Sequence, residues 1–233
     1  MKMMVKKFFL LLWQDSLELS KEAWVIARKM KWWICIYLVS VIITGLVIWG
    51  HDKEYLSKLH PDAPGMAQEM ARTISYWGDF PTGIFLFFVL LYSAGLAMKS
   101  SRFRQIAVAC LLSAAMAGIL ANCFRLTLGR PRPSADAVDG FYGITMLSDY
   151  QGFPSGHAAT GFGSGVAVAV AMPPVGLPML IVAGSIGWAR MKLDRHYPSD
   201  IFVGGSIGTL FGILFGFAVR RCVAREKMDS AGH

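Results

Sequence analysis

The chain has 233 residues, of which 55% are hydrophobic and 16% charged, and its net charge is +8. Ordinary soluble domains carry about 25% charged residues, so this composition argues against a soluble globular protein. The positive charge would suit nucleic acid or anionic lipid, and the long apolar runs favour lipid and exclude nucleic acid as a partner.

The first 33 residues are expected to form an amphipathic helix on the membrane surface. Basic residues precede the apolar stretch FFLLLW, but Gln14 and Asp15 interrupt it and no small-residue cleavage site follows. The segment is therefore interpreted as an uncleaved interfacial helix rather than a signal peptide. Four tryptophans would anchor it at the interface: Trp13, Trp24, Trp32 and Trp33.

Six apolar stretches then approach the length of about 20 residues that a membrane-spanning helix needs. They are residues 34–50, 81–98, 105–124, 157–172, 175–189 and 201–219. The fourth and fifth are short, so their ends should extend into neighbouring residues. We expect an all-α, polytopic membrane bundle of about six transmembrane helices in a single domain, with residues 34–219 as the bundle and 220–233 as a cytoplasmic tail.

The distribution of Lys and Arg predicts the orientation of this bundle. Cations are more frequent in the segments on the side of both termini, which places the termini in the cytoplasm. Most exceptions fall in two stretches on the opposite side, RLTLGRPR and RMKLDR. These stretches need a reason other than topology, and a function at the periplasmic face of a bacterial inner (plasma) membrane would supply it.

The last expected span carries a glycine every four residues: Gly204, Gly208, Gly212 and Gly216. Small residues at this spacing form a stripe that another helix can approach closely. Packing within the chain and a homodimer seam are both compatible with the pattern.

Three polar clusters lie at span ends that connectivity places on the same, outer side. They are RLTLGRPRP (125–133), FPSGH (153–157) and RMKLDRHYPSD (190–200). Arg guanidinium groups suit bidentate phosphate binding, and a helix that begins at PSGH would offer free N–H groups to an anion. His157 beside that anion could act as a general acid. A spacing of four residues lets Asp200 reach back to His196, which is the arrangement of an activated nucleophile.

At these residues the chain resembles the type 2 phosphatidic acid phosphatase family, whose signature reads K-x6-R-P, P-S-G-H and S-R-x5-H-x3-D. The matching segments are Arg125-LTLGRP-Arg132-Pro133, Pro154-Ser155-Gly156-His157 and Ala189-Arg190-MKLDR-His196-YPS-Asp200. Arg125 replaces the family's Lys, which keeps the cation but changes its hydrogen-bond geometry. Ala189 replaces a Ser, which removes one hydrogen bond.

The resemblance implies a membrane lipid phosphatase without metal or other cofactor. His196 would attack phosphorus to form a phosphohistidine, Asp200 would orient it, and His157 would protonate the leaving oxygen. Five residues would hold the phosphate: Arg125, Arg132, Ser155, Gly156 and Arg190. Candidate substrates are undecaprenyl pyrophosphate, phosphatidic acid, phosphatidylglycerol phosphate and a lipid A phosphate.

Three further cations lie within the motifs at variable positions: Arg130, Lys192 and Arg195. They are interpreted either as headgroup contacts or as solvated loop residues. Two other functions stay open, a non-hydrolytic protein that binds or transports lipid phosphates and an enzyme similar to vanadate haloperoxidases. The apolar spans disfavour the second, since those enzymes resemble soluble proteins. The two His and the Asp disfavour the first, because binding needs no nucleophile.

Overall fold

The computed structural model describes residues 2–59, 65–77 and 83–231. The regular structure in these ranges consists of helices, and one of them is a single turn of 3₁₀ helix at Ser148–Tyr150. The helices are α1 (Lys2–Lys29), α2 (Lys31–Trp49), α3 (Asp52–Leu59), α4 (Met66–Trp77), α5 (Phe85–Ala97), α6 (Ser101–Leu128), α7 (Gly156–Ala171), α8 (Pro173–Lys192) and α9 (Pro198–Ala231). The expected all-α membrane bundle is confirmed.

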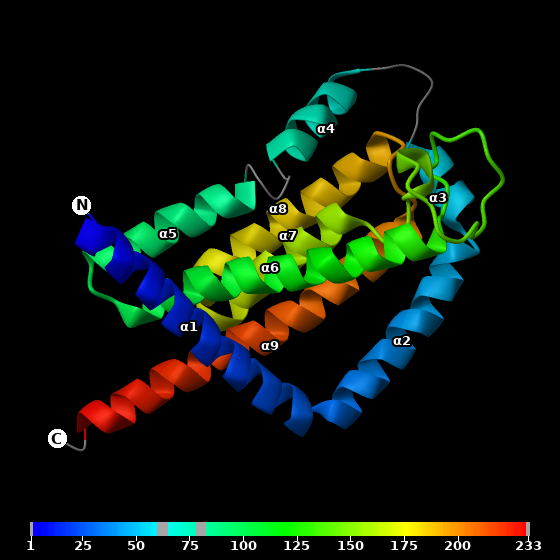
Figure 1. Cartoon of the computed structure of the whole chain (residues 1–233). Coiled ribbons are helices and arrows are strands. Elements are labelled where there is room, and N and C mark those ends of the chain that lie inside the picture. Colours follow the sequence, from blue (N-terminus) through cyan, green and yellow to red (C-terminus); the bar gives the residue numbers. More distant parts are fainter. Residues whose placement is uncertain (1, 60–64, 78–82, 232–233) are drawn as a thin grey trace.

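A bundle of α6, α7, α8 and α9 forms the centre of the molecule, as Figure 1 shows. Helix α5 packs beside α6, α1 crosses α9 and α6, and α4 lies against α8. Both termini are at the same end of the bundle, and the long loop between α6 and α7 is at the other end (Figure 1). Small residues fill the centre, so α7 is buried along most of its length.

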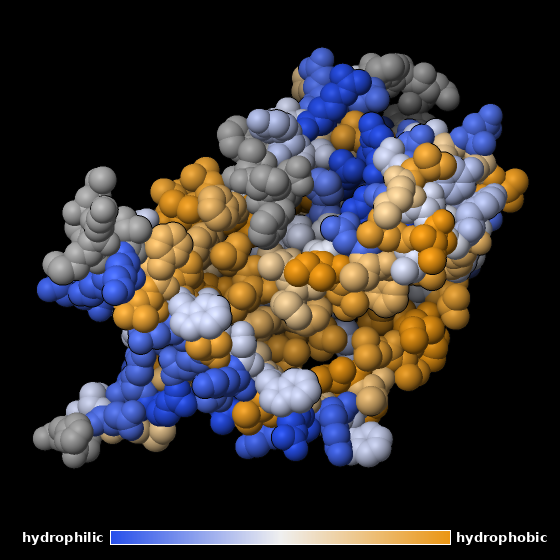
Figure 2. Space-filling model, in the orientation of Figure 1, coloured by the Kyte–Doolittle hydropathy of each residue, from blue (hydrophilic) through white to orange (hydrophobic). Residues whose placement is uncertain are grey.

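The six expected spans correspond to α2 and α5–α9, although residues 81–82 of the second lie outside the described part of the chain. In the described residues, four helices are long and apolar enough to cross a membrane, α2, α6, α8 and α9. Helix α5 has 13 residues and α7 has 16. The surface shows a broad apolar area between hydrophilic regions at the two ends of the bundle (Figure 2), as a membrane-embedded protein requires.

Helix α1 is a helix as expected, and it is docked onto the bundle. Leu19 is fully buried and belongs to the main apolar core. Asp15 is also buried and accepts a hydrogen bond of 3.0 Å from Nε of Arg104 at the start of α6. Residues 220–231, expected to be a tail, continue α9. They are held to α1 by ion pairs, among them Arg221 Nε to Glu22 Oε2 at 3.3 Å.

The glycine stripe of α9 packs against α7 of the same chain. A Cβ added at Gly204 would lie 2.3 Å from the carbonyl oxygen of Ser155, and one at Gly208 would lie 2.3 Å from that of Ala159. Added Cβ atoms at Gly212 and Gly216 would meet Val166 and Val170 of α7 in the same way. Of the two alternatives for this stripe, packing within the chain is the one that the structure shows, because α7 already occupies it.

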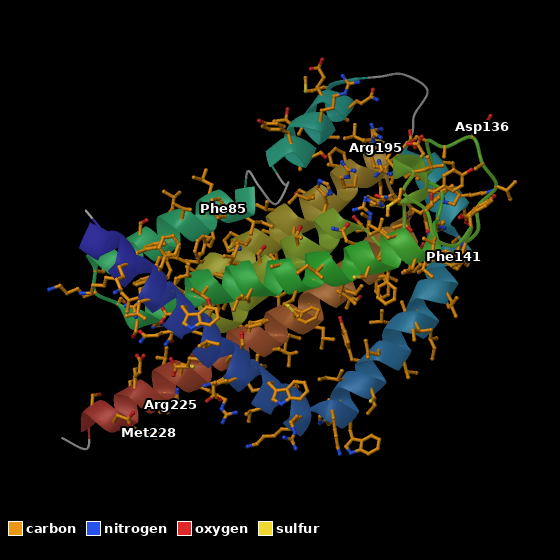
Figure 3. The ribbon with its side chains drawn as sticks, in the orientation of Figure 1. Phe85, Asp136, Phe141, Arg195, Arg225 and Met228 are labelled. Carbon is orange, nitrogen blue, oxygen red and sulfur yellow. The ribbon has the colours of Figure 1, made fainter. Side chains whose placement is uncertain are left out.

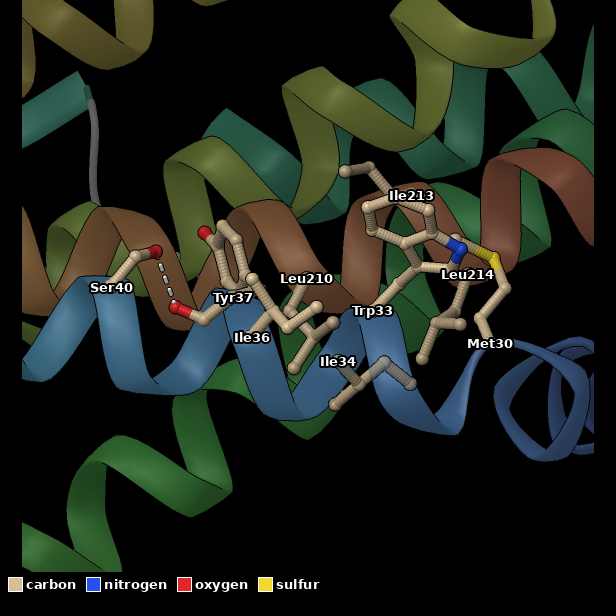
Figure 4. Close-up of a pocket in the computed structure, with 9 residues that line it drawn as sticks. All are labelled: Met30, Trp33, Ile34, Ile36, Tyr37, Ser40, Leu210, Ile213 and Leu214. Carbon is tan, nitrogen blue, oxygen red and sulfur yellow. Dashed lines mark hydrogen bonds between the residues drawn. The ribbon is translucent and has the colours of Figure 1, made fainter.

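Helix α2 leans away from the bundle and leaves an apolar groove against α9. The groove has a volume of about 340 Å³, and Figure 4 shows its walls. In the groove, Tyr37 Oη donates to the carbonyl oxygen of Ser206 at 2.9 Å, and farther along α2 an added Cβ at Gly45 would lie 3.2 Å from Val203. The part of the groove wall that α2 supplies extends from Trp33 to Ser40, in the first half of the helix.

Candidate active site

The structure brings the three polar clusters together at one end of the bundle. The N–H of Ser155 donates to the carbonyl oxygen of Asp200 at 3.0 Å, which joins the second cluster to the third. A Cβ at Gly156 would lie 3.3 Å from Nη1 of Arg125, so the first cluster lies against the second. Figure 3 shows nitrogen atoms gathered near Arg195, between α4 and the loop end of α6.

Local sequence explains how the second and third clusters are held. Ser155 caps α7, and its hydroxyl accepts a hydrogen bond of 3.4 Å from the N–H of Ala158. His157 follows as the second residue of α7 and is partly buried. Helix α9 begins with Pro198, and Oδ2 of Asp200 accepts the N–H of Tyr197 at 2.7 Å, as in a capping box. Both caps place histidines beside helix starts.

His196 is buried and held in one tautomer. Its side chain is 2% exposed, and Nδ1 lies 2.7 Å from the carbonyl oxygen of Gly152. A carbonyl oxygen only accepts hydrogen bonds, so Nδ1 carries the proton and the lone pair is on Nε2. Burial lowers the pKa of His196 well below its ordinary value of 6.5, and the charge of Arg190 lowers it further. The ring is therefore a neutral imidazole with a free lone pair near pH 7.

Asp200 does not hold the imidazole as the sequence predicts. Its Oδ2 lies 3.7 Å from Nδ1 of His196, which is too long for a hydrogen bond. The Gly152 carbonyl oxygen accepts the hydrogen bond from His196 Nδ1 instead. Oδ1 of Asp200 accepts a hydrogen bond from Nη1 of Arg130 at 2.6 Å. Asp200 thus fixes the start of α9, and a backbone carbonyl orients the histidine. The role of Gly152 cannot be predicted from the sequence, because every residue type carries a backbone carbonyl oxygen.

Arg130 is not a headgroup contact, because it is fully buried. Besides Asp200, its guanidinium donates to Asp52 Oδ2 at 2.8 Å, to Ser199 Oγ at 2.8 Å, and to Asp139 Oδ1 and Oδ2 at 2.9 and 3.0 Å. The charge of Arg130 and its hydrogen bonds keep the pKa of Asp139 below its ordinary value, although burial alone would raise it. In the described ranges no three His, Cys, Asp or Glu side chains are grouped to hold a metal ion.

Two aromatic rings complete the surroundings of Arg130. The guanidinium carbon lies 4.9 Å from the ring centre of Trp49 and 4.5 Å from that of Tyr197, as in cation–π contacts. Trp49 ends α2, and its indole N–H donates to Asp139 Oδ2 at 2.8 Å. The Arg130 side chain therefore contacts residues of α2, α3, the α6–α7 loop and α9 and holds these segments together. The contribution of Asp52 cannot be predicted from the sequence, because its partners Arg130 and Ser199 lie far along the chain.

The charges of the three arginines predicted to bind phosphate, Arg190, Arg132 and Arg125, each lower the pKa of His196 after the larger effect of burial, so all three lie near its ring. Arg125 donates from Nε to the carbonyl oxygen of Gln151 at 3.1 Å, and Arg190 donates from Nη1 to Ser75 Oγ of α4 at 2.9 Å. In Arg132, Nε is buried and has no hydrogen-bond partner among the described residues. A buried N–H donor without a partner is costly, and a bound anion would satisfy it.

The two remaining cations of the third cluster, Lys192 and Arg195, differ in their exposure and in their contacts. Lys192 donates from Nζ to the carbonyl oxygen of Leu59, so it joins the end of α8 to the end of α3. Arg195 is exposed, and its charge lowers the pKa of Arg132 after the larger effect of burial and that of Arg125. Arg195 is thus the cation of this pair that remains available to a headgroup.

The PAP2 superfamily sequence profile matches residues 106–225. The chain belongs to the PAP2 superfamily. The match begins in α6 and ends in α9, so it includes all three clusters and the arginines around His196.

Curated relatives of this PAP2 protein include lipid A phosphatases. It is 25% identical to the lipid A 1-phosphatase of Rhizobium etli over 87% of its own length and 91% of the relative. It is 34% identical to the lipid A 4'-phosphatase of Bacteroides thetaiotaomicron over 53% of its length and 58% of the relative.

Two solved structures share the fold. Aquifex aeolicus LpxE covers 70% of this PAP2 protein with a TM-score of 0.53 and 21% identity, and 93% of that chain is matched. The PAP2-type phosphatidylglycerolphosphate phosphatase of Bacillus subtilis covers 76% with a TM-score of 0.55 and 18% identity, and 92% of that chain is matched. The apolar helices, the family match and the lipid phosphatases among its relatives support the same conclusion. This PAP2 protein is a membrane lipid phosphatase, as the sequence predicts.

Proposed function

We propose that this protein removes a phosphate from lipid A, or from a lipid with a similar phosphorylated sugar headgroup, by way of a phosphohistidine at His196. The lipid A phosphatases among its relatives support the substrate class. The observation that carries the mechanism is the hydrogen bond of 2.7 Å between His196 Nδ1 and the Gly152 carbonyl oxygen. It leaves Nε2 unprotonated near three arginines, which would bind the phosphate.

In the first step, Nε2 of His196 attacks phosphorus and a P–N bond forms. The bond between phosphorus and the lipid oxygen breaks, and His157 donates its proton to that oxygen, which leaves as a hydroxyl. The imidazole can accept a bond at Nε2 without losing its Nδ1 proton, because the Gly152 carbonyl stabilises the N–H as positive charge develops on the ring.

In the second step, water attacks the phosphohistidine. His157, now neutral, takes a proton from the water as the P–N bond breaks, and inorganic phosphate leaves. Charge on the three equatorial oxygens is stabilised in both steps by Arg125, Arg132 and Arg190. The N-terminus of α7, capped by Ser155, adds its dipole and free N–H groups.

The active site would face the periplasm from the inner membrane, with both termini in the cytoplasm. Cationic segments near the termini support this orientation, as the positive-inside rule requires. The cationic stretches at the opposite end are those used by the site. A lipid phosphate at the periplasmic surface would then lie at the level of the arginines.

The test is phosphate release by purified protein from a panel of lipids in detergent, with chelator present throughout. Lipid A should be the best substrate among lipid A, phosphatidic acid, phosphatidylglycerol phosphate and undecaprenyl pyrophosphate, and mass spectrometry of the product distinguishes the 1- from the 4'-position. Preference for a glycerophospholipid would contradict the substrate. Loss of activity with chelator would contradict the mechanism.

The phosphohistidine can be trapped directly. In a His157→Ala variant both steps lose the group that moves their proton, so the label is supplied on an aryl phosphate whose phenol leaves without protonation. Because hydrolysis still lacks its base, ³²P should then accumulate on the protein as an acid-labile, base-stable phosphoramidate. A variant carrying both His157→Ala and His196→Ala should take up no label. Equal labelling of the two variants would show that His196 is not the nucleophile.

A further inference from the structure

Residues 141–147, here called the apolar loop, expose large apolar side chains next to the site. Ile144, Met146 and Leu147 are 84%, 81% and 65% exposed. The seven residues FYGITML carry no charge, while acidic residues lie on both sides at Asp139 and Asp149. A contiguous apolar patch of this kind on a folded protein indicates a contact surface.

Backbone hydrogen bonds fix the apolar loop beside the last turn of α6. The N–H groups of Gly143 and Thr145 donate to the carbonyl oxygens of Leu128 and Leu126, each at 3.0 Å. The loop therefore runs back along the last turn of α6 instead of leaving into water. Gly129 permits this path, because its φ of +64° turns the chain and an added Cβ would lie 2.2 Å from the Gly143 carbonyl oxygen.

The apolar loop is also continuous with surface that faces lipid. Phe124, one turn before the end of α6, is exposed, and so are Ile119 and Leu120 farther along that helix. Phe141 packs on Trp49 at the end of α2 with ring centres 4.8 Å apart, and Figure 3 shows it where the loop meets the ends of α2 and α6. The patch thus extends the apolar surface of two membrane helices (Figure 2).

The residues that follow the apolar loop hold the site. The carbonyl oxygen of Asp149 accepts the N–H of Arg132 at 2.7 Å, and Gly152 accepts His196. Between them, Gln151 bonds with Oε1 to Nη2 of Arg125 and with Nε2 to the carbonyl oxygen of Met146, each at 3.4 Å. One side chain therefore joins the apolar loop to a phosphate-binding arginine.

We infer that the apolar loop inserts into the acyl chains of the leaflet on the side of the site and thereby couples lipid contact to the positions of Arg125, Arg132 and His196. The bilayer, not a second protein, is the partner that fits an uncharged surface at the depth of the last turn of α6. The coupling to catalysis rests on the proposed function, whereas the insertion itself does not.

Insertion is tested with a nitroxide label in vesicles. The exposed Cys35 and Cys123 are replaced by Ser, and a single Cys is introduced by Met146→Cys or, as the control, by Asp136→Cys. The label at 146 should collide with oxygen dissolved in lipid, and the label at 136 with a water-soluble nickel chelate. Nickel access at both positions would overturn the inference, as would shielding of position 146 from both reagents, which would indicate a protein partner.

Coupling is tested with Ile144→Ser/Met146→Ser, with Val138→Ser as a control because Val138 is 77% exposed but lies outside the apolar loop. The double variant should lose about tenfold in kcat/KM on lipid phosphate in vesicles, because its loop no longer partitions into lipid. Because the loop would no longer position the arginines and His196, the double variant should lose a similar factor on a water-soluble phosphomonoester in the same vesicles, with unchanged thermal stability, and the control should keep both rates. Loss on lipid phosphate alone, or on neither substrate, would overturn the coupling. If wild type hydrolyses neither, the proposed function fails, and the nitroxide experiment still decides the insertion.

Discussion

The fully buried guanidinium of Arg130 forms ion pairs with three acidic side chains, Asp52, Asp139 and Asp200. Removing one partner of a buried ion pair leaves an uncompensated charge and costs about 3–5 kcal/mol. Burial raises the pKa of Asp52, opposed by its hydrogen bonds with Ser199 and Arg130, so this carboxylate depends on its neighbours for its charge. The site end of the bundle therefore depends on one guanidinium for the attachment of α3, the α6–α7 loop and α9.

Replacing Arg130 by Gln should lower the free energy of unfolding by about 3–5 kcal/mol and reduce kcat, because Asp200 and the start of α9 would shift. Thermal unfolding in detergent and lipid phosphatase assays would measure the two effects. The exposed Arg195→Gln is the matched control and should change stability by less than about 0.5 kcal/mol. Similar stabilities for the two variants would contradict the role assigned to Arg130.

The pH dependence of activity should reflect the lowered pKa of His196. Because burial and then Arg190, Arg132 and Arg125 disfavour the imidazolium, the nucleophile stays neutral to below pH 6.5 and is lost only as pH falls through the lower value. We expect the acid limb of kcat/KM to lie below 6.5. The control is a ³¹P NMR titration of the substrate, since a phosphomonoester itself ionises near pH 6. An acid limb above 6.5 not shared by the substrate would contradict a neutral His196.

At the scale of elements, α7 and α9 form the unit that carries the chemistry. His157 is the second residue of α7 and His196 lies just before α9, so their separation depends on how closely the two backbones pack. The spacing of glycines in α9 predicts a close helix contact but not the identity of the partner, because α7 is itself rich in Ala and Gly. Only the folded arrangement shows that the stripe is already filled.

Gly208→Ala should push α9 away from α7, because the new methyl group would lie 2.3 Å from the Ala159 carbonyl oxygen. We expect a large loss of activity together with reduced thermal stability. Gly184→Ala is the matched control, since nothing lies within 4 Å of its added Cβ, and it should leave activity unchanged. Equal behaviour of the two variants would show that helix spacing does not position the histidines.

For the whole molecule, the sequence predicts most of what hydropathy and connectivity determine. The six apolar stretches became helices, and alternating connections predict that the three polar clusters meet at one end. What the sequence does not reveal depends on tertiary contact. Nothing local shows that Arg130 is buried while Arg195 is exposed, or that Gly152 instead of Asp200 holds His196. Likewise, the return of the apolar loop along α6 appears only in the backbone hydrogen bonds.

The orientation of the bundle can be tested at its two ends, which Figure 3 marks with Asp136 in the loop and Met228 near the end of α9. In a background with Cys35→Ser and Cys123→Ser, a membrane-impermeant maleimide added to intact cells should label Asp136→Cys and not Met228→Cys. Permeabilising the membrane that holds the protein should expose Met228→Cys to the reagent, which controls for its reactivity. The opposite pattern would place the arginines and His196 on the cytoplasmic side, where the same chemistry would need a substrate in the inner leaflet.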